Sequence, residues 1–83
     1  MTRIMGIMIS DRMTEASALQ KVLTDNGCII KTRLGLHEVT DKNCSRKGLL
    51  ILELIGTKDD WNKLESEAKA IQGIEVKYMD FEL

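Results

Sequence analysis

Hydrophobic and polar residues follow each other in a pattern that predicts alternating strands and helices. Residues 3–10 (RIMGIMIS) are short, rich in Ile and Met, and followed by polar residues, which is typical of a strand buried on both faces. From Thr14 the apolar spacing becomes helical, and we expect Thr14 to cap this helix and Gly27 to end it in a left-handed conformation. The apolar stripe of this helix consists of Ala16, Leu19, Val22 and Leu23.

The middle of the chain returns to extended patterns. Residues 28–38 (CIIKTRLGLHE) predict a half-exposed strand, with Ile30, Thr32, Leu34 and Leu36 on one side and Lys31, Arg33 and His37 on the other. The polar segment 39–47 predicts a long loop. After Gly48, the run LLILELIG is mainly apolar on both sides and therefore predicts a central strand.

The last third predicts a second helix and a fourth strand. Thr57 and Asp60 match a capping box, although Asp replaces the preferred Glu, and Gly73 is expected to end the helix. Residues 74–81 (IEVKYMDF) then alternate as in a strand. The apolar stripe of the helix is Trp61, Leu64, Ala68 and Ile71.

The order strand, helix, strand, strand, helix, strand predicts an α+β, ferredoxin-like fold. Right-handed crossovers place both helices on one face of a four-stranded antiparallel sheet, with residues 3–10 and 49–56 as the central strands. A length of 83 residues fits a single domain.

Apolar residues on both faces of the central strands predict a self-associating protein. We expect Ile7, Ile9, Leu49, Ile51 and Ile55 to line the face of the sheet that has no helices. Leaving such side chains in water forgoes roughly 1.5 to 3 kcal/mol each, so something should cover them. A loop or the C-terminal tail is one possible cover, but a second subunit accounts better for so large an apolar face.

The composition excludes several classes of binding partner. The chain has 12 basic and 13 acidic residues, a formal charge of −1, which argues against nucleic acid binding. Two cysteines are too few for a disulfide framework, and no signal peptide or membrane-spanning run is visible. We expect a cytoplasmic protein with free thiols and no membrane partner.

Several site types are absent from the sequence. The cysteines are too far apart for an iron–sulfur cluster, and the segment ISDRMTEAS lacks the thiols of a metal carrier. Neither central strand carries an aromatic residue for stacking RNA bases, and no phosphate-binding glycine loop is present. We therefore expect no cofactor and no enzymatic activity.

His37 and Cys44 are the candidate metal ligands. They can approach each other across the predicted hairpin, and Cys28 or Asp41 of a neighbouring subunit can complete the set. Structural zinc requires four ligands, however, and this loop offers two good ones. A surface imidazole and an incidental loop thiol explain the same residues.

A polar turn, Ser10-Asp11-Arg12, follows the first strand and begins the first helix. One interpretation is ligand capture, in which Arg12 binds a carboxylate and the helix dipole adds positive potential. The other is a solvated turn or a salt bridge between subunits. A hydrolytic set of Ser10, Asp11 and His37 is disfavoured because nothing in the spacing places the imidazole beside Ser10.

Four motifs together resemble the small ACT-like proteins known as iron-only hydrogenase system regulators. They are GIMISDR, RLGLH at residues 33–37, Lys47-Gly48 before the apolar strand, and QGIEVK after the second helix. The resemblance covers nearly the whole chain and implies a single ACT-like domain over residues 1–83, self-association, and a regulatory role in anaerobic bacteria. The turn DRMTEAS lacks the Pro-Gly pair typical of amino-acid-binding ACT domains, which argues against an amino-acid effector.

The sequence thus predicts a non-enzymatic regulatory module, a dimer or tetramer that binds a small effector at a subunit interface and signals to a protein partner. The predicted ligand-binding residues are Asp11, Arg12, Arg33, Gly35 and His37. One alternative is a metal-ion sensor using His37 and Cys44, as in the topologically similar C-terminal domain of nickel-responsive repressors. The other alternative is a purely structural oligomerisation module.

Overall fold

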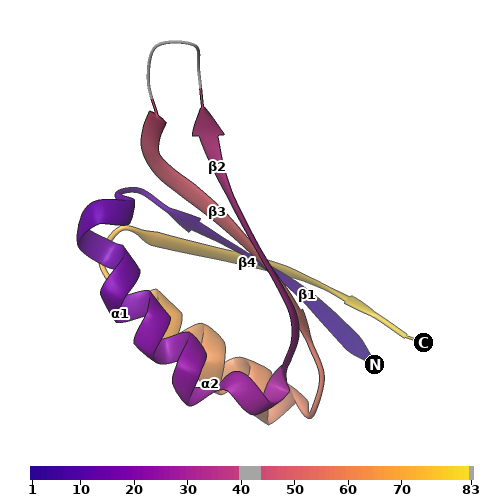
Figure 1. Ribbon diagram of the computed structural model, residues 1–83. Helices are drawn as coiled ribbons and strands as arrows, with labels where there is room; N and C mark the ends of the chain where they lie inside the picture. Colours follow the sequence, from indigo (N-terminus) through magenta and orange to yellow (C-terminus); the bar gives the residue numbers. More distant parts are fainter. Residues whose placement is uncertain (40–43, 83) are drawn as a thin grey trace.

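A computed structural model shows one antiparallel sheet with both helices on the same side (Figure 1). The structure describes residues 1–39 and 44–82, with side chains described for residues 1–35 and 47–82. The strands are β1 (Thr2–Ile9), β2 (Ile30–Val39), β3 (Cys44–Leu54) and β4 (Ile74–Phe81). The helices are α1 (Arg12–Asp25), the short 3₁₀ turn η1 (Gly27–Ile29) and α2 (Lys58–Lys69).

The strand order β2-β3-β1-β4 confirms the predicted ferredoxin-like topology, with β1 and β3 in the centre. β3 begins at Cys44, earlier than the sequence predicts, because polar residues of the expected loop join the ladder opposite β2. Backbone hydrogen bonds hold a two-stranded ribbon together without apolar side chains, so hydrophobicity alone misses this part of the strand.

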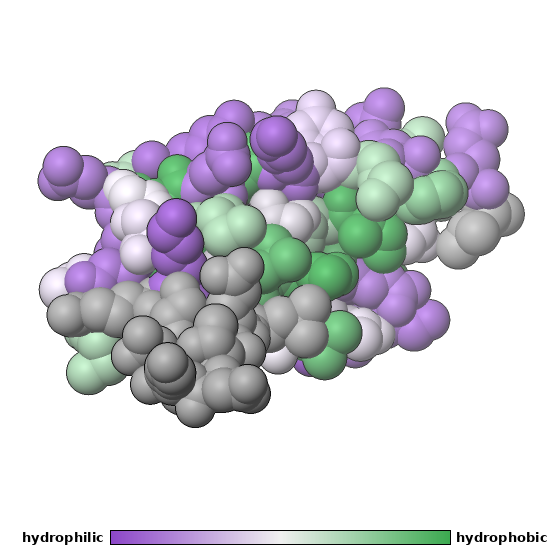
Figure 2. All heavy atoms as spheres, turned by 90° about the horizontal axis from the view of Figure 1, so that it is seen from above, coloured by the Kyte–Doolittle hydropathy of each residue, from purple (hydrophilic) through white to green (hydrophobic). Residues whose placement is uncertain are grey.

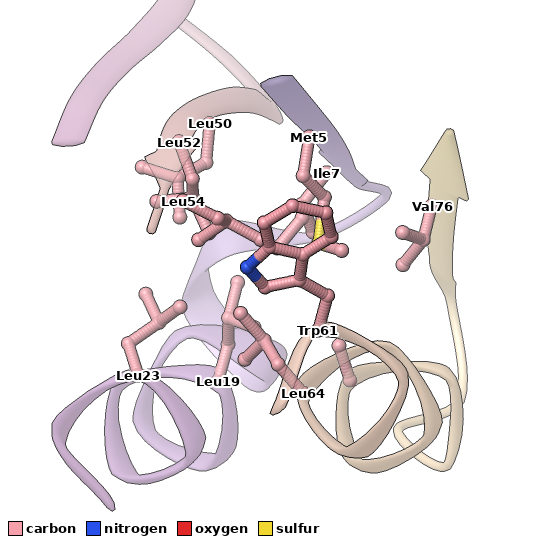
Figure 3. Packing of buried hydrophobic residues seen from close by; sticks show 11 residues of the cluster. Met5, Ile7, Leu19, Leu23, Leu50, Leu52, Leu54, Trp61, Leu64 and Val76 are labelled. Carbon is pink, nitrogen blue, oxygen red and sulfur yellow. The ribbon is translucent and has the colours of Figure 1, made fainter. Parts of the chain in front are cut away.

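The hydrophobic core lies between the sheet and the two helices (Figure 3). Trp61 of α2 is its largest member, and the indole Nε1 donates a hydrogen bond to the Ile55 carbonyl at 2.8 Å. This bond satisfies the polar atom of an otherwise buried ring. The other members are Met5, Ile7, Leu19, Leu23, Leu50, Leu52, Leu54, Leu64, Ala68 and Val76.

The face assignment predicted for β1 is wrong. Ile7 is fully buried against the helices, and Ile9 packs at the edge of the same core. Ile4, Gly6 and Met8 alternate with them and lie on the face without helices. Because both faces of β1 are apolar, the pattern does not decide between them, and the bulkier set enters the core.

For β3 the prediction that Leu49 and Ile51 lie on the face without helices is confirmed. Leu50 is buried beneath the helices, while Leu49 and Ile51 alternate to the open face and are partly exposed. Ile55 is the exception, because it follows the end of β3, where it is 42% exposed and donates its backbone N–H to the Ile29 carbonyl.

Helix α1 begins and ends differently from the prediction. Asp11, not Thr14, is the N-cap, since its carboxylate accepts a hydrogen bond from the Met13 amide at 2.9 Å. Gly27 does not take a left-handed conformation but begins η1. On the predicted apolar stripe, Ala16 is exposed, whereas the remaining positions are buried or half-buried.

Helix α2 begins as predicted but ends earlier. The Thr57 hydroxyl accepts from the Asp60 amide, and the Asp60 carboxylate accepts from the Thr57 amide, which completes the capping box. The Thr57 backbone amide and, second, the Thr57 hydroxyl, which donates to the Asp60 Oδ2 at 2.9 Å, hold the pKa of Asp60 below its ordinary value. The helix ends at Lys69 with Ala70 as its C-cap, before the stop predicted at Gly73, and the positive φ of Gly73, 87°, belongs instead to the turn that leads into β4.

Neither α1 nor α2, the α-helices of the described part of the chain, has the length and apolar character that a bilayer-spanning helix requires.

Candidate functional site

A groove of about 460 Å³ runs between α1 and the helix-facing side of β2 and β3. Helix α1 contacts β3 and β1, and α2 contacts β4, so β2 is the strand that the helices cover least. The described lining residues of the groove are Ile9, Arg12, Met13, Ala16, Leu19, Gln20, Leu23, Arg33, Gly35, Gly48, Leu49 and Leu50.

Two guanidinium groups belong to this lining. Arg12 is the first residue of α1, and Arg33 lies on β2. The Arg33 Nη2 donates a hydrogen bond to the Gln20 Oε1 at 2.7 Å, which links the strand to the helix. The polar part of the groove is therefore cationic, and its deeper part is formed by the core leucines.

Asp11 already occupies the N-terminal end of α1. Its carboxylate accepts from the Met13 amide at 2.9 Å, and its carbonyl accepts from the Glu15 amide at 3.0 Å. A bound anion would have to compete with this carboxylate for the positive end of the helix dipole. Any anion recognition in the groove is thus better supplied by the arginine side chains than by the helix terminus.

The structure brings three of the five predicted ligand-binding residues together. Arg12, Arg33 and Gly35 all line the groove, whereas Asp11 serves as the helix cap beside it. His37 pairs with Gly48 in the β2–β3 ladder, but its side chain lies outside the described residues. Their role in ligand binding stays a prediction.

The metal alternative falls on residues whose side chains are not described. The backbone places Cys44 opposite Val39, beyond the pair of His37 with Gly48. Among the described side chains, His, Cys, Asp and Glu residues form no group of three that could hold a metal ion. Cys28 is an exposed free thiol in η1.

The face of the sheet without helices is the second notable surface, and we call it the open face. Figure 2 looks down on the molecule from the side away from the helices and shows hydrophobic residues gathered in the middle of this view. A hollow of about 330 Å³ lies there, since Gly6 has no side chain to fill it. Its lining is Ile4, Gly6, Leu49, Ile51, Lys77, Tyr78 and Met79.

Leu49 connects the two surfaces. It lines both the groove beside α1 and the hollow on the open face. Its side chain belongs to the open face, and Leu50, the next residue of β3, faces the groove, so the two surfaces lie back to back on this central strand.

A buried carboxylate fixes the turn that leads into the groove. Glu15 accepts hydrogen bonds from the Ser10 hydroxyl at 2.5 Å and from the Asp11 amide at 3.1 Å. The Ser10 amide in turn donates to the Gly73 carbonyl at 3.1 Å. This role of Glu15 was not predicted, because the carboxylate lies one position beyond the N3 site at which a capping box places it.

A second buried charge, Arg3, was also missed. It faces the helices, is 3% exposed, and stacks on Tyr78 with its guanidinium carbon 3.6 Å from the ring centroid and 5.0 Å from that of Trp61. Asp80 lies opposite Arg3 in the ladder and binds it. A basic residue at an inward position of a central strand, with an acid in the last strand, is the available sequence signal.

The chain matches no protein-family model and no curated protein. Similar solved structures include an uncharacterized protein, TM1266 from Thermotoga maritima, with a TM-score of 0.80 and 20% identity, covering 94% of this chain and 92% of that one. The divalent cation tolerance protein CutA from Archaeoglobus fulgidus has a TM-score of 0.58 and 12% identity, covering 100% and 86%.

A larger enzyme contains a similar unit. The formyltetrahydrofolate deformylase from Pseudomonas putida KT2440 has a TM-score of 0.61 and 10% identity, covering 96% of this chain but only 29% of that one. At these identities the comparisons establish the fold alone. The chain has the βαββαβ, ferredoxin-like architecture of these proteins.

Proposed function

We propose that this chain is a non-enzymatic regulatory module that self-associates and binds a small effector, as part of a regulator of an iron-only hydrogenase system. The observation that carries the proposal is that the two surfaces lie on opposite faces of β3, where Leu50 lines the groove and its neighbour Leu49 lines the hollow of the open face. Binding at one surface can then change packing at the other.

The chemistry of the groove supports binding rather than catalysis. Among its described lining residues, none is a serine, cysteine, histidine or carboxylate that could act as nucleophile or general acid and base. What the lining offers instead is positive charge and apolar surface, which recognise a molecule without changing it.

The open face supports self-association. Met8, Leu34, Met79 and Phe81 are each 40% or more exposed on this face, around the hollow at Gly6. A small domain gains burial by covering such a surface with a second copy of itself. Because a two-fold axis brings the same patch of both copies together, the interface would be self-complementary.

The link to a hydrogenase system comes from the sequence resemblance in GIMISDR, RLGLH and QGIEVK. In this role the module would pass its signal to a protein partner rather than to DNA. The formal charge of −1 and the lack of a basic recognition helix favour a protein partner.

Two measurements on the intact chain test the proposal. Light scattering at micromolar concentration should give a mass at least twice 9.4 kDa. A thermal-shift screen of organic acids, amino acids, nucleotides and divalent ions should then find a stabilising class. A monomer refutes self-association, an oligomer that responds to no class is a structural module only, and stabilisation by divalent ions alone would favour the metal sensor.

A further inference from the structure

We propose that the groove between α1 and β2 selects a small organic anion with one carboxylate on an apolar body, and that it discriminates against the corresponding α-amino acid. This inference rests on the proposed function, because it names the chemical class of the effector.

The charge of the groove selects an anion. Arg12 and Arg33 both line it, and none of its described lining residues is acidic. Guanidinium groups bind carboxylates through charge-assisted and often paired hydrogen bonds, which are stronger than those between neutral groups. A single carboxylate can bind at Arg33, which a 2.7 Å hydrogen bond to Gln20 holds against α1.

The remainder of the groove selects an apolar body. Leu19, Leu23 and Leu50 form its deep side and are 2%, 3% and 5% exposed. A polar or second charged group placed against them would lose its hydration without a partner. A short aliphatic or aromatic group gains burial there instead.

Glycine at position 35 leaves room for that body. A Cβ built on Gly35 would lie 3.9 Å from the Leu50 Cδ1, an ordinary contact, so a side chain there would project into the groove without strain in the backbone. A volume of about 460 Å³ accommodates a molecule of metabolite size.

An α-ammonium group finds little to bind beside the carboxylate. Gln20 provides the amide oxygen among the described lining side chains, and this Oε1 already accepts the hydrogen bond from Arg33 at 2.7 Å. The two guanidinium groups also repel a neighbouring positive charge. The groove should therefore prefer a carboxylic acid to an amino acid with the same carbon skeleton.

Three matched compounds test this preference by calorimetry on the intact chain. 4-Methylpentanoate carries the carboxylate and the apolar body, leucine adds the ammonium, and 4-methylpentanol lacks the charge. We expect the carboxylate to bind at least about tenfold more tightly than either of the others, the factor that one charge-assisted hydrogen bond supplies. Equal binding of all three, or no binding of 4-methylpentanoate at 10 mM, would overturn the inference.

Three substitutions test whether 4-methylpentanoate binds in the groove. Arg33→Gln should weaken 4-methylpentanoate binding by about ten- to hundredfold. Lys31→Gln removes the same charge from the same strand, but Lys31 contacts Glu53 outside the groove at 3.8 Å, so binding should persist. Gly35→Val fills the groove with a residue that suits a strand and should abolish binding while circular dichroism stays unchanged.

Ligand binding and light scattering together distinguish a wrong ligand class from a wrong oligomeric state. If the chain is an oligomer but 4-methylpentanoate binding ignores Arg33→Gln and Gly35→Val, the ligand class is wrong and self-association stands. If 4-methylpentanoate binds as described to a chain that light scattering shows to be a monomer, the groove is assigned correctly and the proposed oligomer is wrong.

Discussion

Arg3 and Asp80 join the first and last strands of the sheet through two hydrogen bonds, from Nε to Oδ1 at 2.7 Å and from Nη2 to Oδ2 at 3.0 Å. Arg3 is buried between the rings of Tyr78 and Trp61, so Asp80 compensates a charge that has lost most of its hydration. The hydrogen bond from Arg3 holds the pKa of Asp80 below its ordinary value of 3.8.

The lowered pKa of Asp80 predicts how stability changes in acid. The carboxylate stabilises the folded state fully above the ordinary value of 3.8, and this contribution is lost as the pH falls through the lower pKa of the folded protein. Asp80→Asn should lower the free energy of unfolding at pH 7 and flatten its decline below pH 4. Urea titrations between pH 7 and pH 2 measure both effects.

The control for this experiment is Asp59→Asn, which removes an exposed carboxylate from the first turn of α2. It should change the neutral-pH stability much less than Asp80→Asn. If both variants keep the acid profile of the parent protein, the pair of Arg3 and Asp80 does not govern acid stability. Asp60 and Glu67 also have lowered pKa values, so some decline should remain in every variant.

Gly73 should be the least replaceable glycine for which the contacts are known. Its φ is 87°, and a Cβ would lie 2.3 Å from the Glu15 Oε1 and 2.6 Å from the Ser10 Oγ. Gly73→Ala should cost about 1 to 3 kcal/mol of unfolding free energy. Gly27→Ala is the matched control, since nothing lies within 4 Å of its Cβ. Equal effects of the two substitutions in thermal melts would contradict this account.

Ile51 should be essential for self-association. It lines the hollow of the open face, so a lysine there would place a charge in the interface between copies. Ile51→Lys should raise the dissociation constant at least about tenfold, as expected for a central interface residue. Asn62→Lys adds the same charge to the exposed side of α2 and should keep the parent mass in light scattering. An unchanged mass for Ile51→Lys would mean that another surface joins the copies.

The capping of α1 can be tested by comparing two positions. Asp11→Ala removes the carboxylate that accepts from the Met13 amide and should cost about 1 kcal/mol of unfolding free energy. Thr14→Ala should stay within about 0.5 kcal/mol, because the Thr14 hydroxyl only donates a 3.4 Å hydrogen bond to the Asp11 carbonyl at an exposed position. Urea unfolding of both variants decides between them, and the opposite order would restore Thr14 as the cap.

The sequence was sufficient to predict an element correctly where one hydrophobic periodicity dominated. Residues 74–81 and the capping box at Thr57 were predicted as they occur, because strict alternation and a paired cap each allow a single arrangement. It was insufficient for β1, where residues on both sides are apolar and only packing in the core beneath the helices decides that Ile7 points inward.

For the candidate site, the sequence identified which residues can bind a ligand better than it identified which residues lie next to one another in the fold. Arg12, Arg33 and Gly35 were predicted as parts of one binding site and do line one groove, but the apolar residues that complete its lining depend on how α1 lies against β2, which no local pattern encodes. The buried pair of Arg3 and Asp80 was missed because its members are almost the whole chain apart, and ladder register brings them together.

The pairing of Thr2 with Phe81 brings the two ends of the chain to neighbouring strands at one end of the sheet (Figure 1). A linker of a few residues would therefore close the backbone into a ring without disturbing the ladder between β1 and β4. A circularly permuted chain, opened instead between α2 and β3, should keep the same architecture. Any domain fused to either terminus would therefore leave the molecule from the same end of the sheet.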